Sequence, residues 1–251
     1  MKKNRFTGKT VFITGGANPN GMSYVAANSF LNEEASVFLY DRDEKGLGRS
    51  AEELSQCGRV VIQAGDVRSA EQVESAFTKC EKELGPVDIL INHVGIGPSL
   101  HTLDITETDW HEVIDTNLTG CFFVARAAAR RMTNRQSGII LNMCSTAAIA
   151  AEPGHAHYAA SKAGVLALSK VMAQELSSVG IRVCTICPGD ITTYPWTYPV
   201  ELARLYHSKI AIGRSGRAEE VVAAYLYLAS EDARNLNGCT FVVDGGMLAW
   251  E

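Results

Sequence analysis

The sequence predicts an α/β fold in which helices cover both faces of a doubly wound parallel sheet of about seven strands. Short runs rich in β-branched residues alternate with longer helical patterns, and such alternation builds parallel sheets through crossover connections. The runs are almost continuously apolar, as expected for strands buried on both faces. At 251 residues, 46% of them hydrophobic, the chain suits one large domain spanning residues 1–251.

The strands are expected at Thr10 to Ile13, Ser36 to Tyr40, Arg59 to Gln63, Val87 to Asn92, Gly138 to Met143, Arg182 to Cys187 and Thr240 to Val243. In sheets of this kind ligands bind beyond the carboxyl ends of the strands, where the strand order reverses. The informative side chains are therefore those that follow each strand.

Composition narrows the range of partners. The net charge is -5, and no run of Lys or Arg is longer than the pair Lys2 and Lys3. We therefore expect no nucleic-acid or membrane partner. The apolar stretch near the start is too short for a signal peptide or a membrane span, which favours a cytoplasmic protein. Seven scattered cysteines suit free thiols, and Cys184 and Cys187 should face opposite ways in a strand, so we expect no metal site.

A glycine-rich turn follows the first strand and opens a helix expected from about Met22 to Asn32. Backbone N–H groups in such a turn, together with a helix N-terminus, bind pyrophosphate. The alternative is a tight turn without a ligand, because glycine is common in turns. The candidate cofactor-binding residues here are Gly15, Asn18, Asn20, Gly21 and Met22.

The next two strands also end in polar residues. Asp41 follows the second strand, about twenty residues past the last glycine of the turn, where an adenosine ribose would lie. Its carboxylate would accept from the ribose hydroxyls and repel a 2′-phosphate, which favours NAD over NADP, whereas the neighbouring Arg42 favours a 2′-phosphate. Asp66 and Val67 follow the third strand and are further cofactor candidates.

The fourth strand runs into a flexible turn at the same edge of the sheet. Asn92, Val94 and Gly95 are candidates for the cofactor side of this turn and Ile96 for the substrate side. Further on, Asn117 interrupts an amphipathic helical pattern from Glu107 to Arg131. A short amide and a glycine are costly inside a helix, so a functional or packing role is expected there.

The stretch from Ser145 to Lys162 carries the candidate chemistry. Tyr158 and Lys162 are four residues apart on a predicted helix from His157 to Val179 and so share one face. A phenol with an ordinary pKa of about 10 is a poor general base near neutrality, and an adjacent ammonium lowers that pKa. Ser145 would orient a substrate oxygen. The alternative is an ordinary surface pair of Tyr and Lys beside a strand-end serine.

Taken together, these motifs resemble those of the short-chain dehydrogenases/reductases, in their single-domain form of about 250 residues. The family's T-G-x-x-x-G-x-G matches Thr14 to Gly21, its N-N-A-G matches Asn92 to Gly95, and its P-G-x-x-x-T matches Pro188 to Thr193. Its N-x-x-G asparagine falls on Asn117, its Ser, Tyr and Lys fall on Ser145, Tyr158 and Lys162, and its tail resembles Val243 to Gly246.

The resemblance implies a Rossmann-like three-layer αβα sandwich and hydride transfer between NAD(P) and an alcohol or carbonyl carbon. Tyr158 would be the acid/base, Lys162 would bind the nicotinamide ribose, and Asn117 would hold a water in a proton relay. The resemblance also implies a homotetramer built on the two long helices and the tail. The residues that it adds on the cofactor side are Pro188, Gly189, Ile191 and Thr193.

The sequence departs from the family pattern in two places. Pro19 replaces the middle glycine of the phosphate loop and Asn20 the usual apolar residue; left-handed asparagines there would preserve the turn, and the N–H groups near Asn18 and Asn20 would bind phosphate. His93 and Val94 replace Asn and Ala.

The substrate side is expected at a lid near residues 194–212, with a short helix from Val200 to Lys209. Tyr194 and Trp196 favour an apolar or ring-bearing alcohol or ketone, and His155 is a further substrate candidate. Two other functions stay open: a cofactor-binding or regulatory protein of this fold with weak turnover, and an epimerase or dehydratase.

Overall fold

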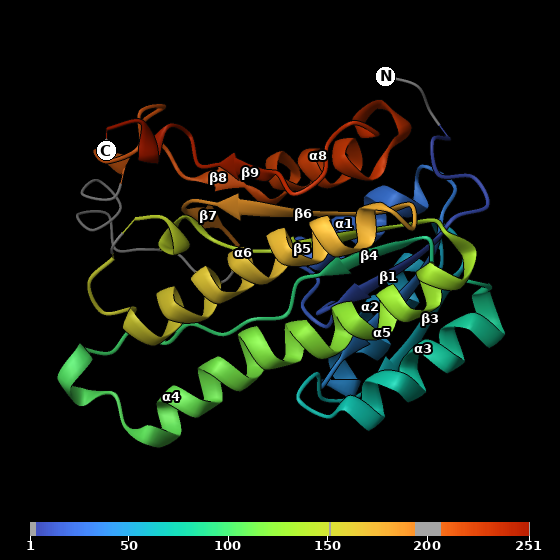
Figure 1. The fold of residues 1–251 in the computed structure, drawn as a ribbon, viewed down its shortest axis with the longest axis horizontal. Helices are drawn as coiled ribbons and strands as arrows, with labels where there is room; N and C mark the ends of the chain where they lie inside the picture. Colours follow the sequence, from blue (N-terminus) through green and yellow to red (C-terminus); the bar gives the residue numbers. More distant parts are fainter. Residues whose placement is uncertain (1–3, 151, 194–206, 251) are drawn as a thin grey trace.

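The computed structural model describes residues 4–150, 152–193 and 207–250. Its centre is a parallel sheet of seven strands in the order β3-β2-β1-β4-β5-β6-β9 (Figure 1). The expected lid lies largely outside the described residues, since Tyr194 and Trp196 and most of the helix predicted from Val200 fall between residues 194 and 206.

The strands of the main sheet lie close to the predicted positions. They are β1 (Thr10–Thr14), β2 (Ser36–Asp41), β3 (Val60–Ala64), β4 (Ile89–Asn92), β5 (Gly138–Met143), β6 (Ile181–Pro188) and β9 (Thr240–Val243). A separate parallel pair joins β7 (Ile191–Thr192) to β8 (Gly216–Arg217).

The α-helices lie between the strands and cover both faces of the sheet. They are α1 (Met22–Leu31), α2 (Glu44–Leu54), α3 (Ala70–Leu84), α4 (Glu107–Ile114), α5 (Gly120–Arg135), α6 (Ala156–Ser177) and α8 (Ala218–Ala229). Short turns of helix are η1 (Thr102–Asp104), η2 (Asp115–Thr119), η3 (Thr146–Ala148), η4 (Glu231–Ala233) and η5 (Met247–Trp250).

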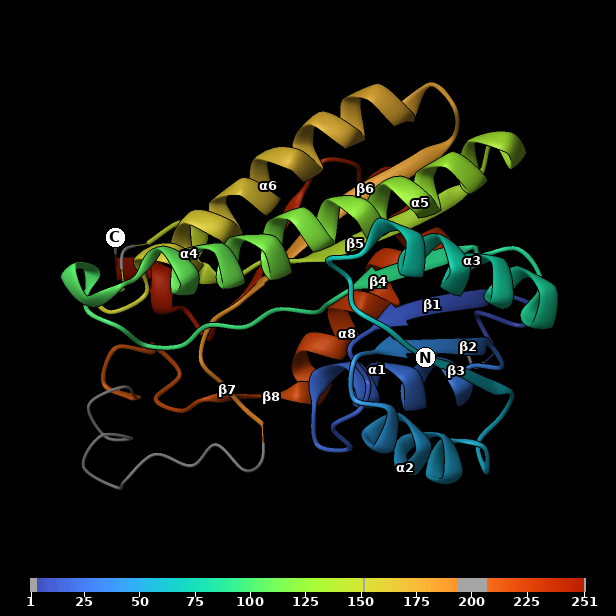
Figure 2. The same cartoon turned by 90° about the horizontal axis from the view of Figure 1, so that it is seen from below.

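Two buried clusters hold the layers together because β-strand side chains alternate between the faces. On one face Val11, Ile13 and Leu39 pack against α1, α2 and α8. On the other face Phe12 stacks on Phe77 of α3, and the cluster continues under α5 and α6. Figure 2 shows the two helical layers on opposite sides of the sheet. The three-layer αβα sandwich predicted from the sequence is confirmed.

The helix expected from Glu107 to Arg131 runs on through Asn117 as α4, η2 and α5. The segment η2 is a π-helix that joins α4 to α5, and the Gly120 N–H donates to the Asp115 carbonyl oxygen. A π turn widens the helix by one residue and is frequent at functional sites. It therefore accommodates Asn117 without ending the helix.

Within the described part of the chain, none of the helices combines the length and the apolar character that crossing a membrane requires.

Candidate active site

A cavity of about 850 Å³ opens at the carboxyl ends of the strands, where β1 and β4 lie side by side and the strand order reverses. The sequence-predicted residues that line it are Gly15, Asn18, Gly21, Met22, Asp41, Arg42, Asp66, Val67, Val94, Gly95, Ile96, Ser145, His155, Tyr158, Lys162, Pro188, Gly189, Ile191 and Thr193. The volume falls in the range of small-molecule and cofactor sites, roughly 300–1,000 Å³.

The glycine-rich loop begins with a backbone conformation that favours glycine. Gly15 has φ +75° and donates its N–H to the Tyr40 carbonyl oxygen at 2.8 Å, which anchors the loop to β2. At the other end of the loop, the α1 N-terminus has no side-chain cap. The first N–H groups of α1 therefore remain available to an anion.

Pro19 sits at the second position of a hydrogen-bonded turn from Asn18 to Gly21. The Gly21 N–H donates to the Asn18 carbonyl oxygen at 2.9 Å, and the Asn20 N–H donates to Asn18 Oδ1 at 3.0 Å. Proline is favoured at that position of a turn. The expectation of left-handed asparagines is wrong, because neither Asn18 nor Asn20 has a positive φ. The Asn20 N–H is also already bonded, and Asn20 does not line the cavity.

Asp41 follows β2 and lines the cavity beside the glycine loop. Its Oδ2 accepts from the N–H groups of Gly16 at 3.0 Å and Ala17 at 3.3 Å, and its Oδ1 accepts from the Asp43 N–H at 3.1 Å. The half-buried carboxylate is thus fixed by backbone donors, whereas Arg42 beside it is exposed.

The carboxylate of Asp66 is already occupied within the protein. Arg68 binds it through Nε and Nη2, at 2.9 and 2.6 Å from Oδ2, and this hydrogen bonding lowers the pKa of Asp66. Asp66 and the buried Val67 still line the cavity. Their contribution to a ligand would come mainly from the backbone and from the apolar surface of Val67.

Lys162 is almost completely buried at the floor of the cavity. It is 3% exposed, its Nζ donates to the Met143 carbonyl oxygen at 3.1 Å, and the same Nζ lies 5.7 Å from the centre of the Tyr158 ring. Both residues come from the first turns of α6, four positions apart. The Tyr158 hydroxyl lines the cavity and makes no hydrogen bond to the described part of the chain.

Ser145 follows β5 and faces the same cavity. Its Oγ accepts from the Ala147 N–H at 3.1 Å, which fixes the side chain and leaves its own O–H as a donor. The backbone of Gly97 packs against the Tyr158 ring, since a methyl group at Gly97 would lie 2.8 Å from Cδ2 of that ring. The cavity thus brings a phenol, an ammonium and a serine hydroxyl together.

Asn117 lies behind this group, out of direct contact with the cavity. Its Oδ1 accepts from the Ile96 N–H at 2.8 Å, while its Nδ2 donates to the Ile96 carbonyl oxygen at 2.8 Å and to Ser161 Oγ at 3.0 Å. Both N–H bonds of the amide are therefore used. Any part of Asn117 in a proton relay must come through its backbone carbonyl or the second lone pair of Oδ1.

Asn92 does not face the cavity. It is buried, and its Nδ2 donates to the Cys121 carbonyl oxygen at 2.9 Å and to Asn142 Oδ1 at 3.1 Å. Asn142 in turn donates to Ser169 Oγ of α6 at 2.8 Å. Asn92 therefore ties β4 to β5 and α5, and the N–H bonds of its amide are used within the protein.

The sequence marked His93 only as a departure from the family pattern, and the structure shows that it lines the cavity and has a specific partner. Its Nδ1 lies 2.9 Å from the hydroxyl of Tyr225, a fully buried residue of α8. Burial, helped by the charge of Lys162, lowers the pKa of His93 to about 3. The imidazole is thus neutral at physiological pH. Only the position of His93 after a strand could have suggested this role.

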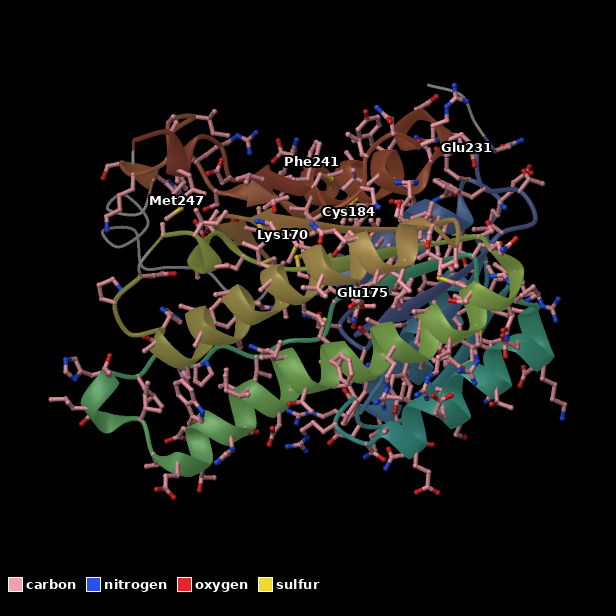
Figure 3. The ribbon with its side chains drawn as sticks, viewed as in Figure 1. Lys170, Glu175, Cys184, Glu231, Phe241 and Met247 are labelled. Atoms are coloured by element: carbon pink, nitrogen blue, oxygen red, sulfur yellow. The ribbon has the colours of Figure 1, made fainter. Side chains whose placement is uncertain are left out.

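Glu152, Ser99, Cys144 and Met247 also line the cavity and were not predicted. The predicted substrate residue His155 lies beside Glu152, with 3.9 Å between His155 Nδ1 and Glu152 Oε1. Figure 3 shows Met247 at the end of the molecule where β6 ends, which brings the tail to the site. In the described residues no group of three or more His, Cys, Asp or Glu side chains is arranged to hold a metal ion.

Comparison with known proteins agrees with this geometry. A family model described as enoyl-(acyl carrier protein) reductase matches residues 15–248. The chain is 34% identical to 2-(S)-hydroxypropyl-CoM dehydrogenase 3 of Xanthobacter autotrophicus, with 98% of this chain and 99% of that protein covered. It is 32% identical to meso-2,3-butanediol dehydrogenase of Serratia marcescens, with 98% and 96% covered.

Solved structures give the same result. Levodione reductase superposes with a TM-score of 0.93 at 29% identity, covering 98% of this chain and 100% of the other. A short-chain type dehydrogenase/reductase from Mycobacterium marinum gives a TM-score of 0.89 at 34% identity, covering 96% of each chain. The fold and these relatives define an oxidoreductase. The chain belongs to the short-chain dehydrogenase/reductase family, whose members use nicotinamide cofactors.

Proposed function

We propose that this protein transfers a hydride between a nicotinamide cofactor, preferably NAD, and a secondary alcohol or ketone. The observation that carries the proposal is the buried Lys162 ammonium beside the Tyr158 phenol, which makes no hydrogen bond within the described residues, in a cavity that also contains the glycine-rich loop. A buried cation stabilises the phenolate, which a general base needs near neutral pH.

The residues present fit such a cofactor. Gly16 lines the cavity and lies so close to β2 that a methyl group there would be 3.1 Å from Leu39, so the glycine lets the loop pack closely on the strand. The uncapped N-terminus of α1 supplies N–H donors. Asp41 would meet the adenosine ribose, and Lys162 would hold the nicotinamide ribose through the N–H bonds that Met143 leaves free.

The bound nicotinamide supplies the hydride chemistry, and the chain supplies the proton chemistry. In ketone reduction, the Tyr158 hydroxyl gives its proton to the carbonyl oxygen as negative charge develops there, and Ser145 donates a hydrogen bond to the same oxygen. In alcohol oxidation the phenolate removes that proton. Asn117 supports the site by holding Ile96 in place.

The substrate class rests on two sets of residues. The aromatic residues of the 194–199 stretch favour an apolar or ring-bearing substrate. Glu152 and His155 add a polar wall in the described part of the cavity, suited to a substrate with a second oxygen. The dehydrogenases and reductases named above act on diverse small molecules, so we propose the reaction class and leave the individual substrate to a screen.

The site is tested by replacing Tyr158 with Phe. The variant should bind NADH as the wild type does, measured by fluorescence, while its kcat falls by about a hundred- to ten-thousand-fold, the usual contribution of acid–base catalysis. If the variant keeps more than a third of the activity, Tyr158 is not the proton donor. If the wild type binds NADH and turns over no ketone or alcohol in a broad panel, the cofactor-binding alternative holds.

We further propose that the protein is a cytoplasmic homotetramer. Large apolar side chains are partly exposed on α4 (Trp110), α5 (Phe122) and α6 (Val171), and a second group lies on α8 (Tyr227) and β9 (Val242). Two separate apolar faces suit the two interfaces of a tetramer. Sedimentation should show a tetramer at micromolar concentration, and a monomer there contradicts the proposal.

A further inference from the structure

Strand β6 carries two cysteines, and each lies opposite another cysteine on a neighbouring strand. The register that pairs Met143 with Ile186 places Cys144 beside Cys187. The register that pairs Thr185 with Thr240 places Cys184 beside Cys239. Cα atoms of neighbours on adjacent strands are about 4.8 Å apart, within the roughly 4.4–6.8 Å that a disulfide spans. All four thiols are free.

The Cys144–Cys187 pair lies directly under the candidate active site. Cys144 precedes Ser145 and lines the cavity, and Cys187 precedes Pro188, which also lines it. Cys144 Sγ donates a hydrogen bond to the Lys162 carbonyl oxygen at 3.2 Å, and the strand register sets Cys187 beside Cys144. The two thiols are therefore neighbours, and Cys144, which is 1% exposed, forms part of the cavity wall.

The environment also favours reaction at Cys144 and not at its neighbour. The hydrogen bond from Cys187, followed by smaller effects of the Ser145 backbone and the Lys162 charge, lowers the pKa of Cys144 although burial opposes this. The same hydrogen bond and burial raise the pKa of Cys187. A thiolate is the reactive form of cysteine, so Cys144 is the first thiol to meet an oxidant that enters the cavity.

We propose that Cys144 and Cys187 are a redox-active dithiol that a small peroxide oxidises to a disulfide, and that this disulfide reversibly inactivates the enzyme. The thiolate of Cys144 attacks one oxygen of hydrogen peroxide, forming a sulfenic acid and releasing hydroxide. Cys187 then attacks the Cys144 sulfur, the S–O bond breaks, and the oxygen leaves as water. Two thiols lose two electrons, and one peroxide becomes two waters.

The disulfide would disturb the residues beside it. The two sulfurs must approach to about 2.05 Å, and Cys144 loses its hydrogen bond to Lys162. Ser145 and Pro188 are covalently attached to the cysteines that move, so their positions in the cavity change. Misplacement of catalytic groups by about 1 Å costs up to roughly a hundredfold in rate. The loss of turnover rests on the proposed function, whereas the disulfide does not.

The second pair provides an internal control. Cys184 belongs to the apolar cluster under α1 and α8, on the opposite face of the sheet, and neither Cys184 nor Cys239 lines the cavity. Figure 3 shows Cys184 well away from Met247, which marks the cavity end of β6. A dinucleotide that fills the cavity should therefore protect Cys144 from peroxide and leave Cys184 and Cys239 unaffected.

The experiment treats the full chain with hydrogen peroxide, with and without saturating NAD, and maps disulfides in unreduced tryptic digests. Cys144 falls in the peptide 136–162, Cys184 and Cys187 in 183–204, and Cys239 in 235–251. We expect a link between 136–162 and 183–204 in the wild type, its absence in Cys187→Ala and in Cys144→Ala, and its retention in Cys239→Ala.

Activity is measured on the same samples, each variant against its own untreated form. We expect the linked wild type and Cys239→Ala to lose activity by on the order of tenfold or more, to regain it with dithiothreitol, and to be protected by NAD. Three results would overturn the proposal. They are a disulfide found only between peptides 183–204 and 235–251, oxidation of Cys144 without a disulfide, and full activity of the protein that carries the Cys144–Cys187 disulfide. If the link forms in a chain that never turns over, the proposed function fails and the dithiol stands.

Discussion

The side-chain amide of Asn117 binds the backbone of Ile96 through two hydrogen bonds. Its Oδ1 accepts from the Ile96 N–H at 2.8 Å, and its Nδ2 donates to the Ile96 carbonyl oxygen at 2.8 Å. This pair of bonds connects the π turn between α4 and α5 to the loop that follows β4. The adjoining Gly97 packs against the ring of Tyr158. The position of the Tyr158 phenol therefore depends on an amide that does not line the cavity.

Replacing Asn117 with Asp should loosen that loop, because a carboxylate cannot donate to the Ile96 carbonyl oxygen and would face it with like charge. We expect kcat to fall on the order of a hundredfold with NADH affinity changed much less. Stopped-flow turnover and NADH fluorescence measure the two effects. A Ser161→Ala variant is the matched control: it removes the third bond and the bond from the Ser161 hydroxyl to the Tyr158 carbonyl oxygen, but it keeps both bonds to Ile96, so it should lose less activity. Equal losses in the two variants would contradict the role assigned to Ile96.

Two glycines of α2 offer a sharp comparison. A methyl group at Gly46 would lie 2.6 Å from both Cβ and the carbonyl oxygen of Ala17 in the glycine loop, whereas one at Gly48 would meet nothing within 4 Å. Gly46→Ala should therefore push the loop away from α2, costing about 1–3 kcal/mol of stability and weakening NAD binding. Gly48→Ala should stabilise the protein by up to about 1 kcal/mol. Thermal unfolding and calorimetric titration test both, and identical behaviour of the variants would refute the contact.

Asp41 should set a preference for NAD. A 2′-phosphate would bring like charge against a carboxylate that three backbone N–H groups already hold in place, and like-charge contacts cost several kcal/mol. Asp41→Ser should narrow the ratio of the two dissociation constants by on the order of tenfold or more. Arg42→Ala should widen the same ratio, because it removes a cation that favours the 2′-phosphate of NADP. Calorimetric titration with both cofactors measures these dissociation constants. Similar affinities of the wild type for NAD and NADP would contradict the role of Asp41 in cofactor preference.

Pro19 should be compatible with a working phosphate loop, since it occupies a turn position that favours proline. Pro19→Gly should leave NAD affinity unchanged or modestly weaker and reduce stability by roughly 0.4–1 kcal/mol through the unfolded state. Pro86→Gly, at an exposed turn that does not line the cavity, is the control. If titration shows that only the glycine variant binds NAD, Pro19 blocks the site.

The Arg5–Glu33 pair should make stability depend on pH. Arg5 Nη2 lies 2.6 Å from Glu33 Oε1, both side chains are mostly buried, and hydrogen bonding to Arg5 lowers the pKa of Glu33 below its ordinary 4.5. A lowered folded-state pKa contributes stability above the unfolded value, and that contribution disappears as the pH falls through the folded value.

At pH 7, Glu33→Gln should therefore cost roughly 1 kcal/mol, and the difference from wild type should vanish at strongly acidic pH. Denaturant unfolding across the pH range measures this. The control is Glu83→Gln, whose cation partner is 4.0 Å away on the exposed surface. A difference that persists unchanged in acid would show that the pair is not responsible.

The strands were predictable because each is a compact apolar run between turn residues, and β5 and β9 agree at both ends. Tyr158 and Lys162 were predictable because helical spacing alone puts them on one face. Features that depend on partners distant in the sequence could not be predicted. His93 acquires its role from Tyr225, 132 residues away, and Asn92 is turned inward by Cys121 and Asn142. Local pattern says nothing about such contacts.

A buried chain of hydrogen bonds runs from Thr14 through Asn92 and Asn142 to Ser169, and it affects the order of folding during synthesis. Its bonds join residues 78, 50 and 27 positions apart, so none of them can form while the chain is short. Bringing distant residues together is slow, because loop-closure entropy is lost before the contacts compensate for it. On the ribosome, the glycine-rich loop and the first strands emerge long before Ser169 does. The nascent chain can therefore complete this buried network, and the cavity beside it, only after α6 has left the exit tunnel, late in synthesis.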